Sequence, residues 1–276
     1  MRNRENVRTM PAMSVSNLTF RYPSRFVKNP EMVLTGINLS IEAGTILGIL
    51  GPNGSGKSTL LKLLARVFSL QEGCIEFYGQ DMQGLSQASI AKTVAFVPQE
   101  TQQIFPFTIG EMVLMGRFPH HAGWGGWHWE DSEDQKIAER AMEDLDVAHL
   151  ADRLITDVSG GERQRAIIAR ALTQEPRILL LDEPTAFLDL HHQLDIARIL
   201  RRFNQDRGLT VVLVSHDLNL ASQYCDQLLL LDRGQIVTTG TPEDVIRPEV
   251  LEQVYGCEVL IDRHPQSGMP RVSLPM

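Results

Sequence analysis

Gly51-Pro52-Asn53-Gly54-Ser55-Gly56-Lys57-Ser58-Thr59 is the stretch that decides the fold, and it lies between an apolar run and an amphipathic run. The apolar run, 46–50, predicts a buried strand, and the amphipathic run, 60–67, predicts a helix. Binding a phosphate requires backbone N–H groups that point inward, in conformations that glycine adopts at low cost. The strand–loop–helix order and the Gly-x4-Gly-Lys-Ser spacing therefore predict a phosphate-binding loop for a nucleoside triphosphate.

All nine residues of this loop are expected to contact ATP. Lys57 is expected to reach the β- and γ-phosphates, and the Ser58 hydroxyl is expected to bind Mg²⁺. The helix that begins near Lys57 adds free N–H groups and the positive end of a helix dipole. The alternative is a glycine-rich turn with a chance lysine, which the complete spacing in strand–helix context disfavours.

The composition describes a globular protein without membrane spans. The chain has 276 residues, 43% of them hydrophobic, and a formal net charge of −8, which argues against a general nucleic-acid binder. No apolar run approaches the roughly 18 residues of a membrane span, and the charged N-terminus does not look like a signal peptide. Cys74, Cys225 and Cys257 form no Cys-x-x-Cys pair, which indicates a reducing compartment such as the cytoplasm.

Polar residues follow two long apolar runs in the second half of the chain. Runs 177–181 and 209–214 lack alternation, which is typical of parallel strands buried on both faces. Asp182 and Glu183 follow the first run and His216 follows the second, and ligands bind at such strand ends. We expect Asp182 to order the Mg²⁺ shell, Glu183 to polarise a water and His216 to sense the γ-phosphate. The alternatives are strand-end charges that reach solvent and a histidine that is merely hydrogen-bonded.

Three further features leave alternatives open. Tyr22 is a candidate to stack on an adenine ring, but it is equally an ordinary edge-strand aromatic. The segment 123–129 packs three tryptophans and three glycines into seven positions, as a partner-contact loop or as a turn that covers neighbouring helices. His120, His121 and His128 lack a carboxylate or cysteine at ligand spacing, so no metal beyond Mg²⁺ is indicated.

A second motif connects the chain to a known family. Val158-Ser159-Gly160-Gly161-Glu162-Arg163-Gln164 resembles the signature sequence of the ATP-binding cassette (ABC) ATPases, and the resemblance extends over roughly 13–240. It implies an α/β fold of the P-loop NTPase class, with a mixed, mainly parallel sheet, an antiparallel β subdomain and an inserted α-helical subdomain. It also implies that Ser159, Gly160 and Gly161 hold the γ-phosphate bound by an opposite subunit, in a head-to-tail ATP-sandwich homodimer.

The resemblance carries over to further residues, one by one. Gln99 matches the glutamine loop, which joins the metal site to the helical subdomain, so Ser58, Gln99 and Asp182 form the predicted Mg²⁺ set. Phe187-Leu188-Asp189 matches the segment that communicates across the dimer, which assigns Asp189 to the catalytic set with Glu183, His216 and Gln99. Tyr22 matches the adenine-stacking aromatic. The chain departs from the family pattern at Val158, at Ala186-Phe187 and in the long stretch 22–34.

The predicted organisation follows from this match. Residues 1–12 are expected to form a disordered lead-in, 13–240 an ABC ATPase domain and 241–276 a C-terminal extension. Helical periodicity over about 107–176 marks the inserted helical subdomain.

A single cassette without fused membrane helices resembles the ATPase subunit of a bacterial or archaeal importer. Such a subunit docks on two permease subunits, fed by a substrate-binding protein, at the cytoplasmic face of the cell membrane. Met115-Gly116-Arg117-Phe118-Pro119-His120, Leu188-Asp189-Leu190 and His192-Gln193 resemble the branch that imports iron–siderophore complexes, haem or cobalamin. The alternatives are an importer ATPase for another substrate such as metal ions, a soluble ABC ATPase without a transport role, and a nucleotide-binding module without catalysis. Glu183 and His216 count against the last of these, and the substrate itself depends on the permease and the binding protein.

Overall fold

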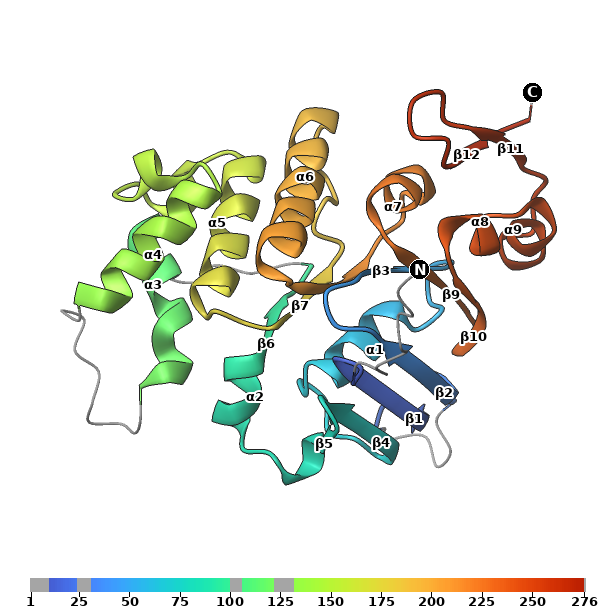
Figure 1. Cartoon of the computed structure of the whole chain (residues 1–276), viewed down its shortest axis with the longest axis horizontal. Coiled ribbons are helices and arrows are strands. Elements are labelled where there is room, and N and C mark those ends of the chain that lie inside the picture. The colour runs from blue at the N-terminus through green and yellow to red at the C-terminus, as the bar shows by residue number, and fades with distance from the viewer. Residues whose placement is uncertain (1–9, 24–30, 100–105, 122–131, 276) are drawn as a thin grey trace, which may run out of the picture.

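The structure is a computed structural model that describes residues 10–23, 31–99, 106–121 and 132–275 (Figure 1). The tryptophan-rich segment 123–129 and most of the predicted lead-in 1–12 lie outside these residues. Ala12 is fully buried, and its carbonyl accepts a hydrogen bond from the Tyr78 backbone at 3.1 Å. Among the described residues no helix has the length and apolar character needed to cross a bilayer.

A six-stranded sheet with the order β10-β9-β3-β8-β7-β6 forms the centre of the molecule. All neighbouring strands in it are parallel except β9 and β10, which form an antiparallel hairpin. The strands are β3 (Ile46–Leu50), β6 (Val94–Val97), β7 (Ile178–Asp182), β8 (Thr210–Val214), β9 (Gln227–Asp232) and β10 (Gln235–Gly240). Every residue of β3 and β7 is buried, as their unbroken apolar runs predict.

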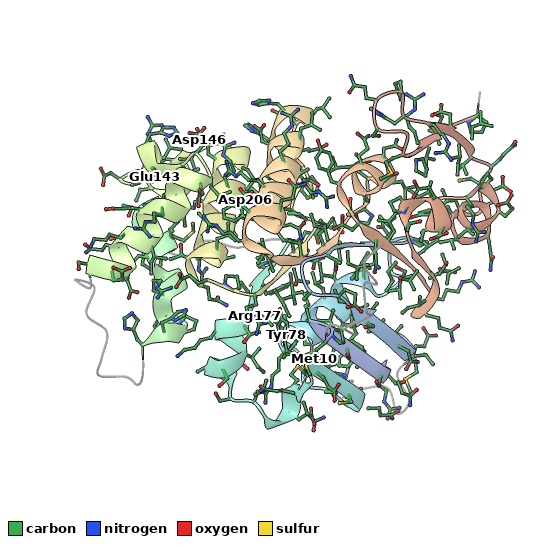
Figure 2. All side chains as sticks on the ribbon, viewed as in Figure 1. Met10, Tyr78, Glu143, Asp146, Arg177 and Asp206 are labelled. Atoms are coloured by element: carbon green, nitrogen blue, oxygen red, sulfur yellow. The ribbon has the colours of Figure 1, made fainter. Side chains whose placement is uncertain are left out.

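A second, antiparallel sheet with the order β2-β1-β4-β5 covers helix α1 (Lys57–Leu64). Its strands are β1 (Met13–Phe20), β2 (Leu34–Ile41), β4 (Glu72–Phe77) and β5 (Gln80–Asp81). Leucines of α1 share one core with the inner residues of this sheet and of the central sheet. The guanidinium of Arg177, just before β7, lies 3.6 Å from the centre of the Tyr78 ring, and Figure 2 shows the two side chains together where the sheets meet.

The segment between β6 and β7 is helical, as its periodicity predicts. It contains α3 (Ile109–Leu114), the 3₁₀ segment η2 (Met115–His120), α4 (Ser132–Asp144), the 3₁₀ turns η3 (Ala148–Leu150) and η4 (Ile155–Asp157), and α5 (Gly160–Thr173). Helices α3, α4 and α5 pack on one another, while α5 also contacts β6 of the central sheet. The helical segment therefore contacts the central sheet through α5. Before it lie η1 (Met82–Gly84) and α2 (Gln87–Thr93).

The C-terminal residues pack against the rest of the molecule and share a core with the central sheet. After α6 (Leu190–Arg207) and α7 (Leu218–Tyr224) follow α8 (Pro242–Val245), α9 (Pro248–Tyr255) and a hairpin of β11 (Leu260–Arg263) and β12 (Pro270–Ser273). Helices α8 and α9 and the hairpin all lie within 241–276, the segment that the sequence assigns to a C-terminal extension. Ser222 and Asn219 of α7 donate hydrogen bonds to the carbonyls of Pro270 and Val272, so the hairpin is held on α7.

Candidate functional site

The glycine-rich loop connects β3 to α1, and its glycines adopt conformations that other residues avoid. Gly51, Gly54 and Gly56 have φ values of +147°, +78° and +104°. A Cβ on Gly51 would also come within 2.0 Å of the Leu231 carbonyl oxygen. The sequence predicted glycine here because it adopts positive φ values at low cost, and this reason applies to all three positions. At Gly51 close packing is a second reason.

Lys57 lies inside this loop. Its side chain is 5% exposed, and Nζ donates hydrogen bonds of 2.9 Å to the carbonyls of Gly51 and Pro52. Burial lowers the pKa of Lys57, although the nearby carboxylates of Glu183 and Asp182 act in the opposite direction. The cation is thus held where the loop curves around it.

Ser58 and Asp182 come together from the start of α1 and the end of β7. The Ser58 hydroxyl donates a 2.8 Å hydrogen bond to Oδ1 of Asp182, which is 1% exposed. Burial raises the pKa of Asp182, while Ser58 and two lysines act against this shift. A hydroxyl beside a buried carboxylate is the hard oxygen donor set that Mg²⁺ prefers, so these residues fit the predicted metal.

Glu183 lies between Gln99 and His216. Each of these three residues follows a different strand of the central sheet. Glu183 Oε2 accepts a hydrogen bond from Gln99 Nε2 at 2.7 Å, and Glu183 Oε1 lies 2.5 Å from His216 Nε2. Glu183 has φ +51°, and its N–H binds the Val214 carbonyl at the end of β8. Glu183 is therefore in direct contact with both of the other predicted residues.

A surface groove runs along the loop and these strand ends. Its lining consists of Tyr22, Val33, Asn53, Gly54, Gly56, Lys57, Ser58, Thr59, Glu183 and His216. The Tyr22 hydroxyl lies 2.8 Å from Thr59 Oγ1, while the ring packs edge-on against Phe20 and Phe68. Tyr22 is 44% exposed, so its ring is anchored by the loop and by aromatic neighbours and is still open to a ligand.

Ser159, Gly160, Gly161 and Asp189 do not line this groove. Ser159 is the N-cap of α5, where it forms a capping box with Glu162. Asp189 is the N-cap of α6, and its carboxylate accepts a hydrogen bond from the His192 backbone. The signature motif thus begins a helix, as expected, but within one chain it does not reach the phosphate-binding loop.

Sequence reasoning missed two contacts near the site. The ring of His192 lies directly beside Gly161, and its Nδ1 lies 3.2 Å from Arg165 Nη1. Tyr255 of α9 receives a hydrogen bond from the backbone of Gly51, although burial raises the pKa of this phenol to about 12. No local sequence signal marks either contact, because both join segments that are distant along the chain.

His191, His192 and Asp195 bring possible ligand atoms within 4.8 Å of one another at the start of α6. The Arg165 cation beside His192 disfavours a bound metal ion there, and we assign none.

The central sheet, the glycine loop and the strand-end carboxylates define a phosphate-loop nucleoside triphosphatase. Residues 34–186 match the family model of the ABC transporter. The chain belongs to this family, as an ATP-binding subunit with ATPase activity coupled to transport.

Individual relatives support the same assignment. The petrobactin import ATP-binding protein FpuC of Bacillus anthracis is 39% identical over 90% of this chain and 88% of its own length. The hemin import ATP-binding protein HmuV of Vibrio vulnificus is 39% identical over 93% of this chain and 95% of its own length. Among solved structures, an inward-facing metal-chelate type ABC transporter covers 96% of this chain and 97% of its own, with a TM-score of 0.81 and 31% identity.

Proposed function

We propose that this chain powers the import of an iron–siderophore complex, haem or cobalamin across the cell membrane, as one subunit of an ABC importer. The observation that carries the ATPase part is the position of Glu183, which is held by Gln99 and His216 beside Lys57. The choice of cargo rests on relatives named for petrobactin and hemin import. In this assignment 13–240 is the ABC ATPase domain, about 107–176 is its helical subdomain and 241–276 is its C-terminal extension.

The groove suggests a role for each residue in hydrolysis. Gly51 to Thr59 bind the phosphates, while Lys57 neutralises their charge and Tyr22 stacks on the base. Ser58, Asp182 and Gln99 would hold Mg²⁺, which would supply charge stabilisation on the phosphate oxygens. Glu183 accepts a proton from the attacking water, and His216 keeps the Glu183 carboxylate oriented through its 2.5 Å contact.

The signature residues require a second copy of the chain. Ser159 caps a 14-residue helix that begins at Gly160 and Gly161 and whose N-terminal N–H groups suit an anion, but none of the three residues lines the groove of its own chain. Phe187, two residues before Asp189, is 92% exposed, as expected for a segment that meets a partner. A head-to-tail homodimer brings the signature residues of one copy to the ATP bound by the other.

A second groove supports docking to a permease. It lies between the helical segment and β6, and 62%-exposed Phe118 is on its rim. Its lining residues are Phe96, Pro98, Met115, Gly116, Phe118, Pro119, Ile167, Arg170, Ala171 and Gln174. Pro98 directly precedes Gln99, so a permease segment bound here would act close to the metal set. We therefore assign the partners as two permease subunits, fed by a substrate-binding protein, and the location as the cytoplasmic face of the membrane.

Co-purification from native membranes tests this function. The tagged chain is extracted in mild detergent, and the proteins that accompany it are identified while an absorption spectrum is recorded. We expect a polytopic permease in equal amount, and a haem or corrin band would identify the cargo class. A chain recovered without any membrane protein would refute the importer assignment and favour a soluble ABC ATPase. A permease whose binding protein takes free metal ions would instead indicate a metal-ion importer.

A further inference from the structure

The segment 115–121, which forms one wall of the second groove, is fixed to the C-terminal end of α5. A Cβ on Gly116 would lie 2.2 Å from the Arg170 carbonyl oxygen, so only glycine permits this approach. Arg117 is 7% exposed, and its Nη1 donates hydrogen bonds to the Thr173 carbonyl at 3.0 Å and to Glu175 at 2.7 Å. The guanidinium thus caps the last turn of α5, where a cation is favoured by the helix dipole.

The same guanidinium also binds α4. Arg117 Nε donates to Oδ1 of Asp134 at 2.7 Å, and the other carboxylate oxygen of Asp134 lies 2.5 Å from His121 Nε2. Burial opposes ionisation of Asp134, but hydrogen bonds from Arg117 and His121 outweigh it and hold the pKa of this carboxyl below its usual range. One buried ion pair therefore ties the groove wall to two helices at once.

The contacts continue into the central sheet. His120 Nε2 lies 2.9 Å from the carbonyl of Gln174, the residue that follows α5. The Gln174 side chain donates to the carbonyl of Val94 at 2.8 Å and to that of Ala91. Val94 is the first residue of β6, the strand that leads to Gln99. We call Arg117, His120, His121, Asp134 and Gln174 the Arg117 network.

Helix α5 connects this network to the signature motif. It runs for 14 residues from Gly160 to Thr173, which corresponds to about 21 Å of rigid rod. The signature residues form its N-terminal end, and the Arg117 network holds its C-terminal end. A displacement of the groove wall is therefore transmitted along α5 to Gly160 and Gly161.

We infer that Arg117 is a positioning residue that joins the docking wall 115–121, α5 and β6 into one mechanical unit, so that permease movement repositions the signature motif. This assigns a role to the Met115-to-His120 motif, which the ATP site itself does not use. The inference rests on the proposed function, since a permease must occupy the groove. Arginine suits this role because its planar guanidinium has several donors in fixed directions. It donates hydrogen bonds to Asp134 of α4, to the last carbonyl of α5 and to Glu175 simultaneously.

Hydrogen exchange of the isolated full chain tests the mechanical part without a permease. Arg117→Met removes the fork and keeps the apolar stem, and Arg117→Met with Asp134→Asn also removes the unpaired buried carboxylate. Exposed Arg140 on the same helix as Asp134 provides the matched control, Arg140→Met. We expect amide exchange in 115–121 to rise about tenfold in both Arg117 variants and to remain unchanged in the control. Unchanged exchange in both Arg117 variants would refute the inference.

ATPase measurements test the coupling. The isolated double variant should bind and hydrolyse ATP like the wild type, because no residue of the ATP groove is altered. In complexes purified from membranes, the factor by which the permease stimulates the ATPase activity of the double variant over that of the isolated chain should fall by about 2- to 30-fold. Arg117→Lys, which preserves the Asp134 pair, should restore part of this stimulation. Full stimulation of the ATPase activity in the double variant would refute the coupling. A wild-type chain that purifies without any membrane protein would refute the proposed function and the coupling with it. The hydrogen-exchange result would remain valid in that case.

Discussion

Gly161→Ala is the substitution whose effect the structure specifies most directly. A Cβ at position 161 would lie 2.4 Å from Cδ2, 2.5 Å from Cγ and 2.7 Å from Nε2 of His192. The ring cannot turn away freely, because its Nδ1 is bound by Arg165, whose buried Nε has no partner among the described residues. The neighbouring Gly160 is the matched control, since a Cβ there meets only a Leu188 methyl at 3.7 Å.

Two effects of opposite sign determine how a glycine-to-alanine substitution changes the free energy of unfolding. Replacing glycine by alanine inside a helix stabilises it by about 0.5–1 kcal/mol. Forcing extra atoms into a close-packed site costs about 1–3 kcal/mol. At position 160 only the first effect operates, whereas at 161 the second outweighs it. Gly161→Ala should therefore be less stable than Gly160→Ala by about 1–3 kcal/mol.

Urea unfolding of the isolated chain measures this difference. Adding His192→Ala should remove the clash and leave only the helix effect, so that the Gly161→Ala/His192→Ala double variant is more stable than His192→Ala alone by about 0.5–1 kcal/mol. Equal stability of the two alanine variants at 160 and 161 would refute the reasoning. A double variant whose cost equals the sum of the two single costs would do the same.

Three other outcomes are expected. Glu183→Gln should retain ATP affinity but slow hydrolysis by about 10²–10⁴, and wild-type turnover would contradict its role as base. Burial raises the pKa of Asp182, so the ionised carboxylate lowers the stability of the folded chain as the pH rises through the folded pKa. Asp182→Asn should therefore melt at a higher temperature than the wild type at pH 7, and this gain should disappear below about pH 3.9. A constant gain at all pH values would exclude this cause. The same variant should lose Mg²⁺-dependent hydrolysis. Iodoacetamide should label exposed Cys257 and spare Cys225, whose pKa burial raises to about 12; native labelling of Cys225, detected by mass spectrometry, would disprove its protection.

Most strands could be predicted because their apolar runs are local signals. The run 46–50 is strand β3 with the predicted bounds, and the runs 177–181 and 209–214 agree with β7 and β8 to within one residue. The helix predicted over 60–67 instead runs from Lys57 to Leu64, since the phosphate loop continues directly into it. Strand β12 (Pro270–Ser273) was not predictable, because it is short, half-buried and stabilised by β11 and by Asn219 of α7.

The convergence of Glu183, His216 and Gln99 follows from topology, since parallel strands present their carboxyl ends at one edge of the sheet. The contact between Gly161 and His192 does not, because it depends on how two helices pack. For the same reason the sequence motif at 115–120 indicated a branch of the family but not the buried pair of Arg117 and Asp134.

The two packing glycines clarify why α5 can transmit movement. Neither Gly116 nor Gly161 has a left-handed backbone, so conformational freedom does not explain glycine at these positions. Each instead allows a close approach at an opposite end of α5: Gly116 to the Arg170 carbonyl and Gly161 to the His192 ring. At one end α5 is thereby fixed to the groove wall, and at the other to α6, which begins just after Asp189. A helix that packs too closely at both ends to admit even a Cβ has little room to slide, so movement of one attachment is transmitted to the other.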